Sequence, residues 1–200
     1  VAAAVWMFRN RLKGEIHSSG AMLSGFSLLS RPRFAYGTAS IFLYVGAEVA
    51  IGSLIVNYLM QGHVLGLPEQ AAGKMIPFYW GGALLGRFIG SAVLRLVSPG
   101  KVLACVATGA IALLAISANS TGHLAAYSLL AIGLMNSIMF PTIFSLACEG
   151  LGSRAADGSG VICMAIVGGA LVPPLTGHLA DVSGSLAFAL WLPALCYLLI

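Results

Sequence analysis

The chain has 200 residues, of which 59% are hydrophobic and only 8% are charged. A soluble domain carries about 25% charged residues, so this composition cannot cover a water-facing surface and indicates a membrane protein. The net charge of +4 is too small and too dispersed to suit a nucleic-acid partner, and the scattered cysteines and histidines predict neither disulfides nor a metal or cofactor site.

The chain divides into a short apolar start, a polar linker and a long apolar region. Residues 1–8 are expected to be the tail of a preceding transmembrane helix, and residues 9–33 a cytoplasmic linker. Within this linker, "AMLSGFSLL" fits a short amphipathic helix on the membrane surface as well as a plain loop. Residues 34–200 are expected to form a bundle of six transmembrane helices, because each of six apolar runs approaches the length of about 20 residues that a span needs. These runs are 35–60, 72–97, 102–118, 124–148, 158–180 and 186–200.

Basic residues lie mainly in the loops on one side of these six predicted spans. By the positive-inside rule this side is the cytoplasm, so the bundle should begin and end there. The basic residues on this side are Arg9, Arg11, Lys13, Arg31, Arg33, Arg95, Lys101 and Arg154. The opposite loops carry Glu69, Lys74 and Asp181.

Glu48 is the only charged residue between Phe34 and Met60, close to the middle of the first full span. Its helical face includes Tyr44 and Gly52 and is partly small and polar, so it should meet protein or a water-filled cavity rather than lipid. Carboxylates at membrane depth usually have a function. We therefore favour a role in binding a substrate hydroxyl or carrying a proton over a structural bond to a neighbouring helix.

The second span combines a glycine pattern with an internal arginine. Glycines at 82, 86 and 90 have the spacing that allows helices to pack closely. Arg87 needs a partner inside a span, and the candidates are Glu149, Asp157 or the C-terminal carbonyls of another helix. Such a pair could hold one conformational state. Arg95 and Lys101 bracket a Ser-Pro-Gly turn after the span.

The later spans carry further polar residues and prolines. Asn136 lies at the centre of the fourth span, as Glu48 does in the first, which suggests two groups of three helices in an inverted repeat. Pro141, Pro173 and Pro174 are expected to kink their helices and allow gates to bend. Asp157 precedes the fifth span, where it suits a helix cap.

Four separate segments, in order, resemble one branch of the major facilitator superfamily. They are "FLYVGAEVAIGSLIVNYL" (42–59), "GRFIGSAVLRLVSPGKVL" (86–103), "FPTIFSLA" (140–147) and "GGALVPPLTGHLAD" (168–181). The branch contains fucose permeases and glucose/galactose transporters. The resemblance implies the C-terminal half of a twelve-helix transporter in a bacterial inner membrane. It also implies a hexose as substrate, proton-coupled symport by alternating access, and a missing N-terminal six-helix half as partner within the lipid bilayer.

For Glu48, the resemblance favours a role as a sugar ligand over a role as the proton carrier. Tyr44 and Asn136 are further candidate sugar ligands, each about equally open to a structural role between helices. Asn57 is a candidate nearer the outer end. Tyr79, beside Trp80, suits the membrane interface better, with a sugar platform as the alternative.

A transporter of another small polar solute and a stand-alone six-helix scaffold remain alternatives. An intramembrane enzyme is not predicted, since the sequence places neither a nucleophile–base pair nor a set of metal ligands at membrane depth.

Overall fold

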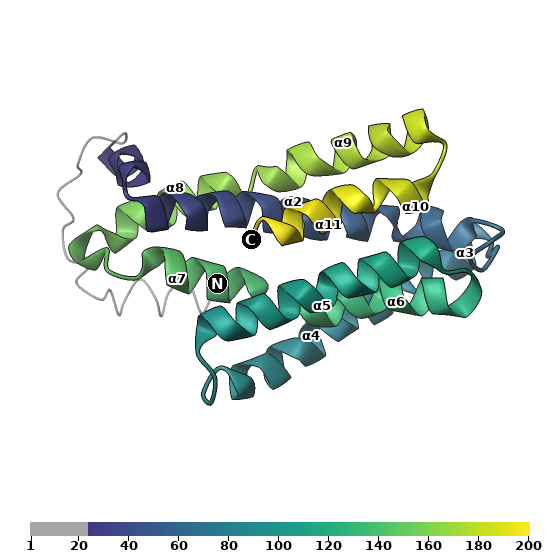
Figure 1. The fold of residues 1–200 in the computed structure, drawn as a ribbon, viewed down its shortest axis with the longest axis horizontal. Helices are drawn as coiled ribbons and strands as arrows, with labels where there is room; N and C mark the ends of the chain where they lie inside the picture. The colour runs from purple at the N-terminus through teal and green to yellow at the C-terminus, as the bar shows by residue number, and fades with distance from the viewer. Residues whose placement is uncertain (1–23) are drawn as a thin grey trace, which may run out of the picture.

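The computed structural model describes residues 24–200, and this range is built of helices and their connections (Figure 1). The expected tail at 1–8 and the linker up to residue 23 lie outside the described residues. The end of the linker forms a 3₁₀-helix, η1 (Ser24–Ser30). This short helix packs against two helices of the bundle, α2 and α8, and buries Leu28 completely.

The first three predicted spans correspond to the longest unbroken helices. Helix α2 (Pro32–Met60) is followed by a short α3 (Glu69–Gly73), then α4 (Ile76–Val93) and α5 (Pro99–Asn119). Helices α2, α4 and α5 each have a proline in the first two positions, where the missing N–H has no helical partner to lose. The sequence therefore marks the start of each of these helices.

The last three predicted spans are each divided into two pieces. The fourth consists of α6 (Gly122–Asn136) and α7 (Met139–Cys148). The fifth consists of α8 (Ala155–Ala165) and α9 (Gly168–Ser183), preceded by the 3₁₀ turn η2 (Gly152–Arg154). The sixth consists of α10 (Leu186–Ala189) and α11 (Trp191–Leu198).

Four helical segments in the described range are long and apolar enough to cross a membrane: Pro32–Met60, Pro99–Asn119, Gly122–Cys148 and Gly152–Ser183. Helix α4, which contains Arg87, and the shorter apolar segment Leu186–Leu198 occupy the positions of the other two predicted spans. The chain is therefore an all-helical membrane protein.

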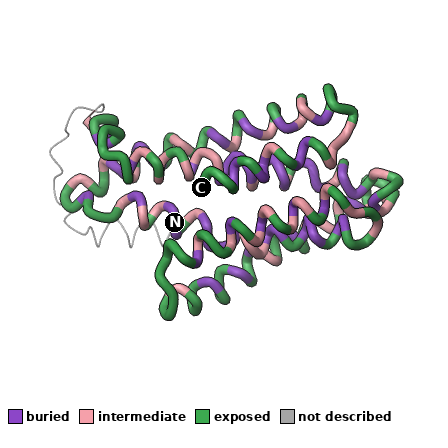
Figure 2. Tube along the Cα trace, in the orientation of Figure 1, coloured by how far each residue is buried: buried purple, intermediate pink, exposed green. Residues whose placement is uncertain are grey.

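The long helices run roughly along the long axis of the molecule, with α2 in the middle of the bundle (Figure 1). Helix α2 packs against α9, α7 and α11, while α5 packs against α6 and α11. Helix α4 lies on the outside and packs chiefly on α6. Many residues on the outer sides of α4 and α9 are exposed, and buried residues follow the sides that face other helices (Figure 2).

Helix α4 packs closely on α6 through the three glycines predicted to allow it. A side chain at Gly82 would meet the backbone of Leu134, one at Gly86 would meet Ser137, and one at Gly90 would meet Ile138. From the other side, Gly133 faces the backbone of α4 directly: a Cβ there would lie 2.0 Å from the carbonyl oxygen of Tyr79. The predicted close packing is confirmed.

Replacing Gly133 by alanine is expected to destabilise the protein by about 1–3 kcal/mol, because the added methyl group would push α4 away from α6. Thermal unfolding of the purified protein in detergent measures this change. Gly81→Ala is the matched control, since a methyl group at this helical position of α4 meets nothing within 4 Å. Equal unfolding temperatures for the two variants would contradict the close contact.

The helix interruptions match the prolines only in part. The fourth span breaks at Ser137–Ile138, and Pro141 follows as the third residue of α7. A proline ring conflicts with the carbonyl four residues earlier, which here belongs to Ser137, so this break is where Pro141 should place it. Pro173 and Pro174 instead lie inside α9, which is assigned as one helix. The fifth span breaks earlier, at Ile166–Val167.

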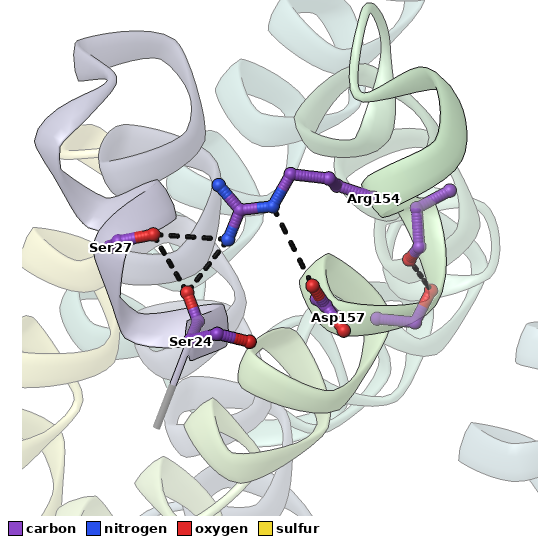
Figure 3. A network of polar contacts seen from close by, with 6 residues as sticks. Ser24, Ser27, Arg154 and Asp157 are labelled. Carbon is purple, nitrogen blue, oxygen red and sulfur yellow. Dashed lines mark hydrogen bonds and ion pairs between the residues drawn. The ribbon is translucent and has the colours of Figure 1, made fainter. Parts of the chain in front are cut away.

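Two ion pairs hold one end of the bundle together. Arg33 at the start of α2 pairs with Glu149 after α7. Arg154 pairs with Asp157 at 3.5 Å and also donates hydrogen bonds to the Ser24 carbonyl and the Ser27 hydroxyl of η1 (Figure 3). Arg154 thereby fixes the end of the linker on the start of α8.

These pairs correct two predictions. Asp157 does not cap α8, because Arg154 occupies the N-cap position and Asp157 lies in the first turn. Arg87 pairs with neither Glu149 nor Asp157, since the nearer arginines Arg33 and Arg154 take both carboxylates.

Candidate functional site

A buried cluster of hydrogen bonds joins four helices around Asn136. The side-chain amide of Asn136 donates to the Tyr79 hydroxyl at 2.8 Å, and the Tyr197 hydroxyl donates to the amide oxygen at 2.7 Å. The Tyr44 hydroxyl donates to the backbone carbonyl of Asn136 at 2.9 Å. We call these four residues the asparagine–tyrosine cluster.

Each member of this cluster comes from a different helix: Tyr44 from α2, Tyr79 from α4, Asn136 from the end of α6 and Tyr197 from α11. All four are at most 2% exposed. Polar groups in the membrane interior must find partners within the protein. The cluster supplies them, and it holds the end of α6 at the point where the fourth span breaks.

Glu48 lies one helical turn after Tyr44 at the edge of the cluster. Tyr79 connects Glu48 with Asn136. Its hydroxyl lies 3.4 Å from the backbone carbonyl of Glu48 and accepts the hydrogen bond from the Asn136 amide. The Glu48 side chain is close to the Tyr44 hydroxyl and within electrostatic range of Arg87. Glu48 is half-buried and forms no ion pair with any residue in the range 24–200. Its carboxylate is therefore less committed to the protein than the Asn136 amide.

The sequence favours a membrane-interface position for Tyr79, and the structure contradicts this. Tyr79 is fully buried, because its place on α4 faces α6 and its hydroxyl reaches the cluster. Trp80, the next residue, is 47% exposed and packs edge-on against Tyr79, with 5.1 Å between the ring centroids. The indole of Trp80 packs near Gly52, one turn along α2 from Glu48: a Cβ there would lie 3.5 Å from its Cζ2 atom.

Tyr197 is a member of the cluster that the sequence did not indicate. It lies in the apolar run "LPALCYLLI", where one tyrosine has no periodic pattern to mark it. Buried tyrosines usually find a partner for the hydroxyl, and that rule is the one available signal.

The structure separates Asn57 from the cluster. Nine residues after Glu48 at 3.6 residues per turn, Asn57 lies on the opposite side of α2. Asn57 is exposed and lines a cavity of about 470 Å³ between the ends of α2 and α9. Gln61, Asp181 and Ser185 also line this cavity.

Two further candidates, Arg95 and Pro141, form none of the cluster's hydrogen bonds. Arg95 is exposed in the connection between α4 and α5, and Pro141 is exposed near the start of α7. No group of three or more His, Cys, Asp or Glu side chains in residues 24–200 could hold a metal ion. The polar groups at and beside the cluster are a carboxylate, an amide and phenol hydroxyls, which suit hydrogen bonding to a polar solute.

The chain was compared with known proteins. No protein-family model matches it. It is 55% identical over 161 residues to a glucose/galactose transporter of Brucella abortus, a match covering 80% of this chain and 39% of the relative. It is 34% identical over 197 residues to the L-fucose-proton symporter of Escherichia coli, covering 94% and 44%.

Solved structures give the same result. A crystal structure of a major facilitator superfamily transporter, FucP, in the outward conformation matches with a TM-score of 0.88 and 31% identity, over 100% of this chain and 50% of that one. The chain spans less than half the length of the curated relatives it matches. The sequence matches and the shared helical fold together place this chain in the family of major facilitator superfamily sugar transporters that contains the fucose–proton symporters and the glucose/galactose transporters.

Proposed function

We propose that residues 34–200 form the C-terminal six-helix half of a twelve-helix transporter, arranged as an inverted repeat of three and three helices. Residues 9–33 are the cytoplasmic linker from the missing N-terminal half, and residues 1–8 end that half. The transporter moves a hexose of the glucose/galactose type by proton-coupled symport, with the two halves rocking around a site near the bilayer midplane.

The observation that carries this proposal is the half-buried Glu48 carboxylate beside the asparagine–tyrosine cluster. A carboxylate can accept hydrogen bonds from two neighbouring sugar hydroxyls, and charge-assisted bonds of this kind are strong. The exposed part of Trp80 offers an apolar face to a sugar ring. The Asn136 amide is occupied by Tyr79 and Tyr197, so Asn136 serves this site mainly by positioning the four helices.

Alternating access needs elements that bend, and the breaks of the fourth and fifth spans supply them. The α6–α7 break precedes Pro141, and the α8–α9 break precedes Pro173 and Pro174. Movement at these breaks would leave the ends of the helices free to open or close the site. Arg95 and Asp157, at the end of the bundle that carries the ion pairs, contribute to closure on that side.

Arg87 contributes to the site electrostatically. It is exposed on α4 and within range of Glu48. As a cation within electrostatic range of Glu48, Arg87 would attract the Glu48 carboxylate and help to orient it toward the sugar.

The full-length transporter is expected to accumulate radiolabelled glucose or galactose in membrane vesicles when an inward proton gradient is imposed. Collapsing the gradient should abolish accumulation and leave sugar exchange intact, because exchange needs the binding site alone. Uptake of fucose in parallel vesicles assigns the sugar class. Failure to bind or move any hexose would overturn the proposed function and favour another polar solute.

A further inference from the structure

A second cavity lies between α4, α5 and the α6–α7 junction, at the end of the bundle where α4 connects to α5. Its volume is about 340 Å³. The walls are almost entirely apolar, and they include Ile89, Val93, Val97, Val106, Met135 and Ile138. This cavity is separate from the proposed sugar site, because none of the members of the asparagine–tyrosine cluster lines it.

The cavity opens on a face of α5 that no other described helix covers. Lys101 and Cys105 line it one turn apart, and both are exposed. The exposed residues Ala104 and Thr108 lie toward α11 instead, where they line another cavity with Tyr197 and Leu198. Apart from Lys101 the residues of this cavity wall on α5 are uncharged, which suits contact with lipid and access to the cavity sideways from the bilayer.

Positive charge lies on the cavity wall at Lys101 and in the adjoining α4–α5 connection at Arg95. The stem of Lys101 lines the wall, so its ammonium group can extend to the membrane surface, as lysines near helix ends do. Arg95 is exposed in the same connection. Neither forms an ion pair within residues 24–200, whereas Glu149 and Asp157, two acids of this end, are paired with other arginines.

We propose that this cavity binds an anionic phospholipid of the inner leaflet, with an acyl chain between α4 and α5 and the phosphate at Lys101 and Arg95. Basic pockets between transmembrane helices on the cytoplasmic side are suited to anionic headgroups. A zwitterionic lipid offers the same chain but no net charge to these two cations. The bound chain also packs against Ile138 at the break of the fourth span, so the lipid stabilises the arrangement of that break.

The test uses the delipidated full-length transporter and measures binding of dioleoylphosphatidylglycerol and dioleoylphosphatidylcholine by native mass spectrometry. We expect tighter binding of the phosphatidylglycerol. Lys101→Gln and Arg95→Gln should each weaken it roughly fivefold, as expected for one basic residue at a membrane surface, and should leave phosphatidylcholine binding unchanged.

Two matched controls locate the site. Lys74→Gln, at the opposite end of the bundle, should change neither affinity. Cys105→Phe should weaken the binding of both lipids, because the larger side chain fills the cavity. Cys163→Phe, at an exposed position on α8, should leave the binding of both lipids unchanged. If the cavity variant fails to fold, the surface charge variants still decide. Equal affinity of the wild type for both lipids, or wild-type affinity in Lys101→Gln, would mean only non-specific annular lipid and would overturn the proposal.

Discussion

Glu48→Ala should abolish most sugar uptake by the full-length transporter, whereas Glu48→Gln should retain much of it. A hydrogen-bonding ligand needs polarity and reach, which glutamine keeps and alanine loses. Loss of one charge-assisted hydrogen bond to a sugar costs about 1.5–3 kcal/mol, which is roughly a ten- to hundredfold loss of affinity. Uptake of labelled galactose or glucose in vesicles, with and without an imposed pH gradient, measures the effect.

The same pair of variants separates sugar binding from proton coupling. If Glu48→Gln binds and exchanges sugar normally but loses all gradient-driven accumulation, then Glu48 carries the proton. Normal transport by Glu48→Ala would show that the glutamate is structural. Glu69→Gln is the matched control, because Glu69 is an exposed acid in the short helix α3 and should leave uptake unchanged.

The helices could be predicted from the sequence because apolar length and proline position act locally. The first span was predicted over 35–60 and α2 runs from Pro32 to Met60; the third was predicted over 102–118 and α5 runs from Pro99 to Asn119. The close packing of the glycines at 82, 86 and 90 was predicted as well, since their spacing alone puts them on one face of the helix.

The break of the fifth span and the cluster could not be predicted in the same way, because both involve contacts between residues distant in sequence. The fifth span breaks at Ile166–Val167, just before Gly168, where a Cβ would lie 2.0 Å from the carbonyl oxygen of Phe42 on α2. The prolines six residues later had suggested a different position. Tyr197 meets Asn136 across 61 residues of sequence, and a single tyrosine in an apolar run does not reveal such a partner.

Glu48 and Asn136 illustrate the same limit within the site. Each lies at the centre of a predicted span, and Tyr79 connects them in the folded chain. The sequence could not distinguish an asparagine that binds substrate from one that binds other helices. In the folded chain the partners of its side chain are tyrosine hydroxyls, which favours the second role.

Asn136→Ala should therefore lower stability and uptake together. The Tyr197 hydroxyl would lose its acceptor and the Tyr79 hydroxyl its donor, both in a fully buried setting. Leaving a buried polar group unsatisfied costs about 1–3 kcal/mol, so the variant should lose roughly 2–5 kcal/mol of stability. Thermal unfolding in detergent and vesicle uptake, measured on the same preparations, give the two readouts. Asn119→Ala is the control, since Asn119 is exposed and bonds only within its own helix.

A double-mutant cycle with Tyr197→Phe decides whether the bond itself carries the effect. Tyr197→Phe removes one hydroxyl from the cluster and should cost about 1–3 kcal/mol by leaving the Asn136 amide oxygen without its donor. Because Asn136 and Tyr197 contact each other, the cost of the double variant should fall short of the sum of the single costs by at least 0.5 kcal/mol, the lower end for coupled neighbours. If Asn136 were instead a sugar ligand, Asn136→Ala would weaken sugar binding while its unfolding temperature stayed at the wild-type value. That result would show that Asn136 binds the substrate and does not mainly position the helices.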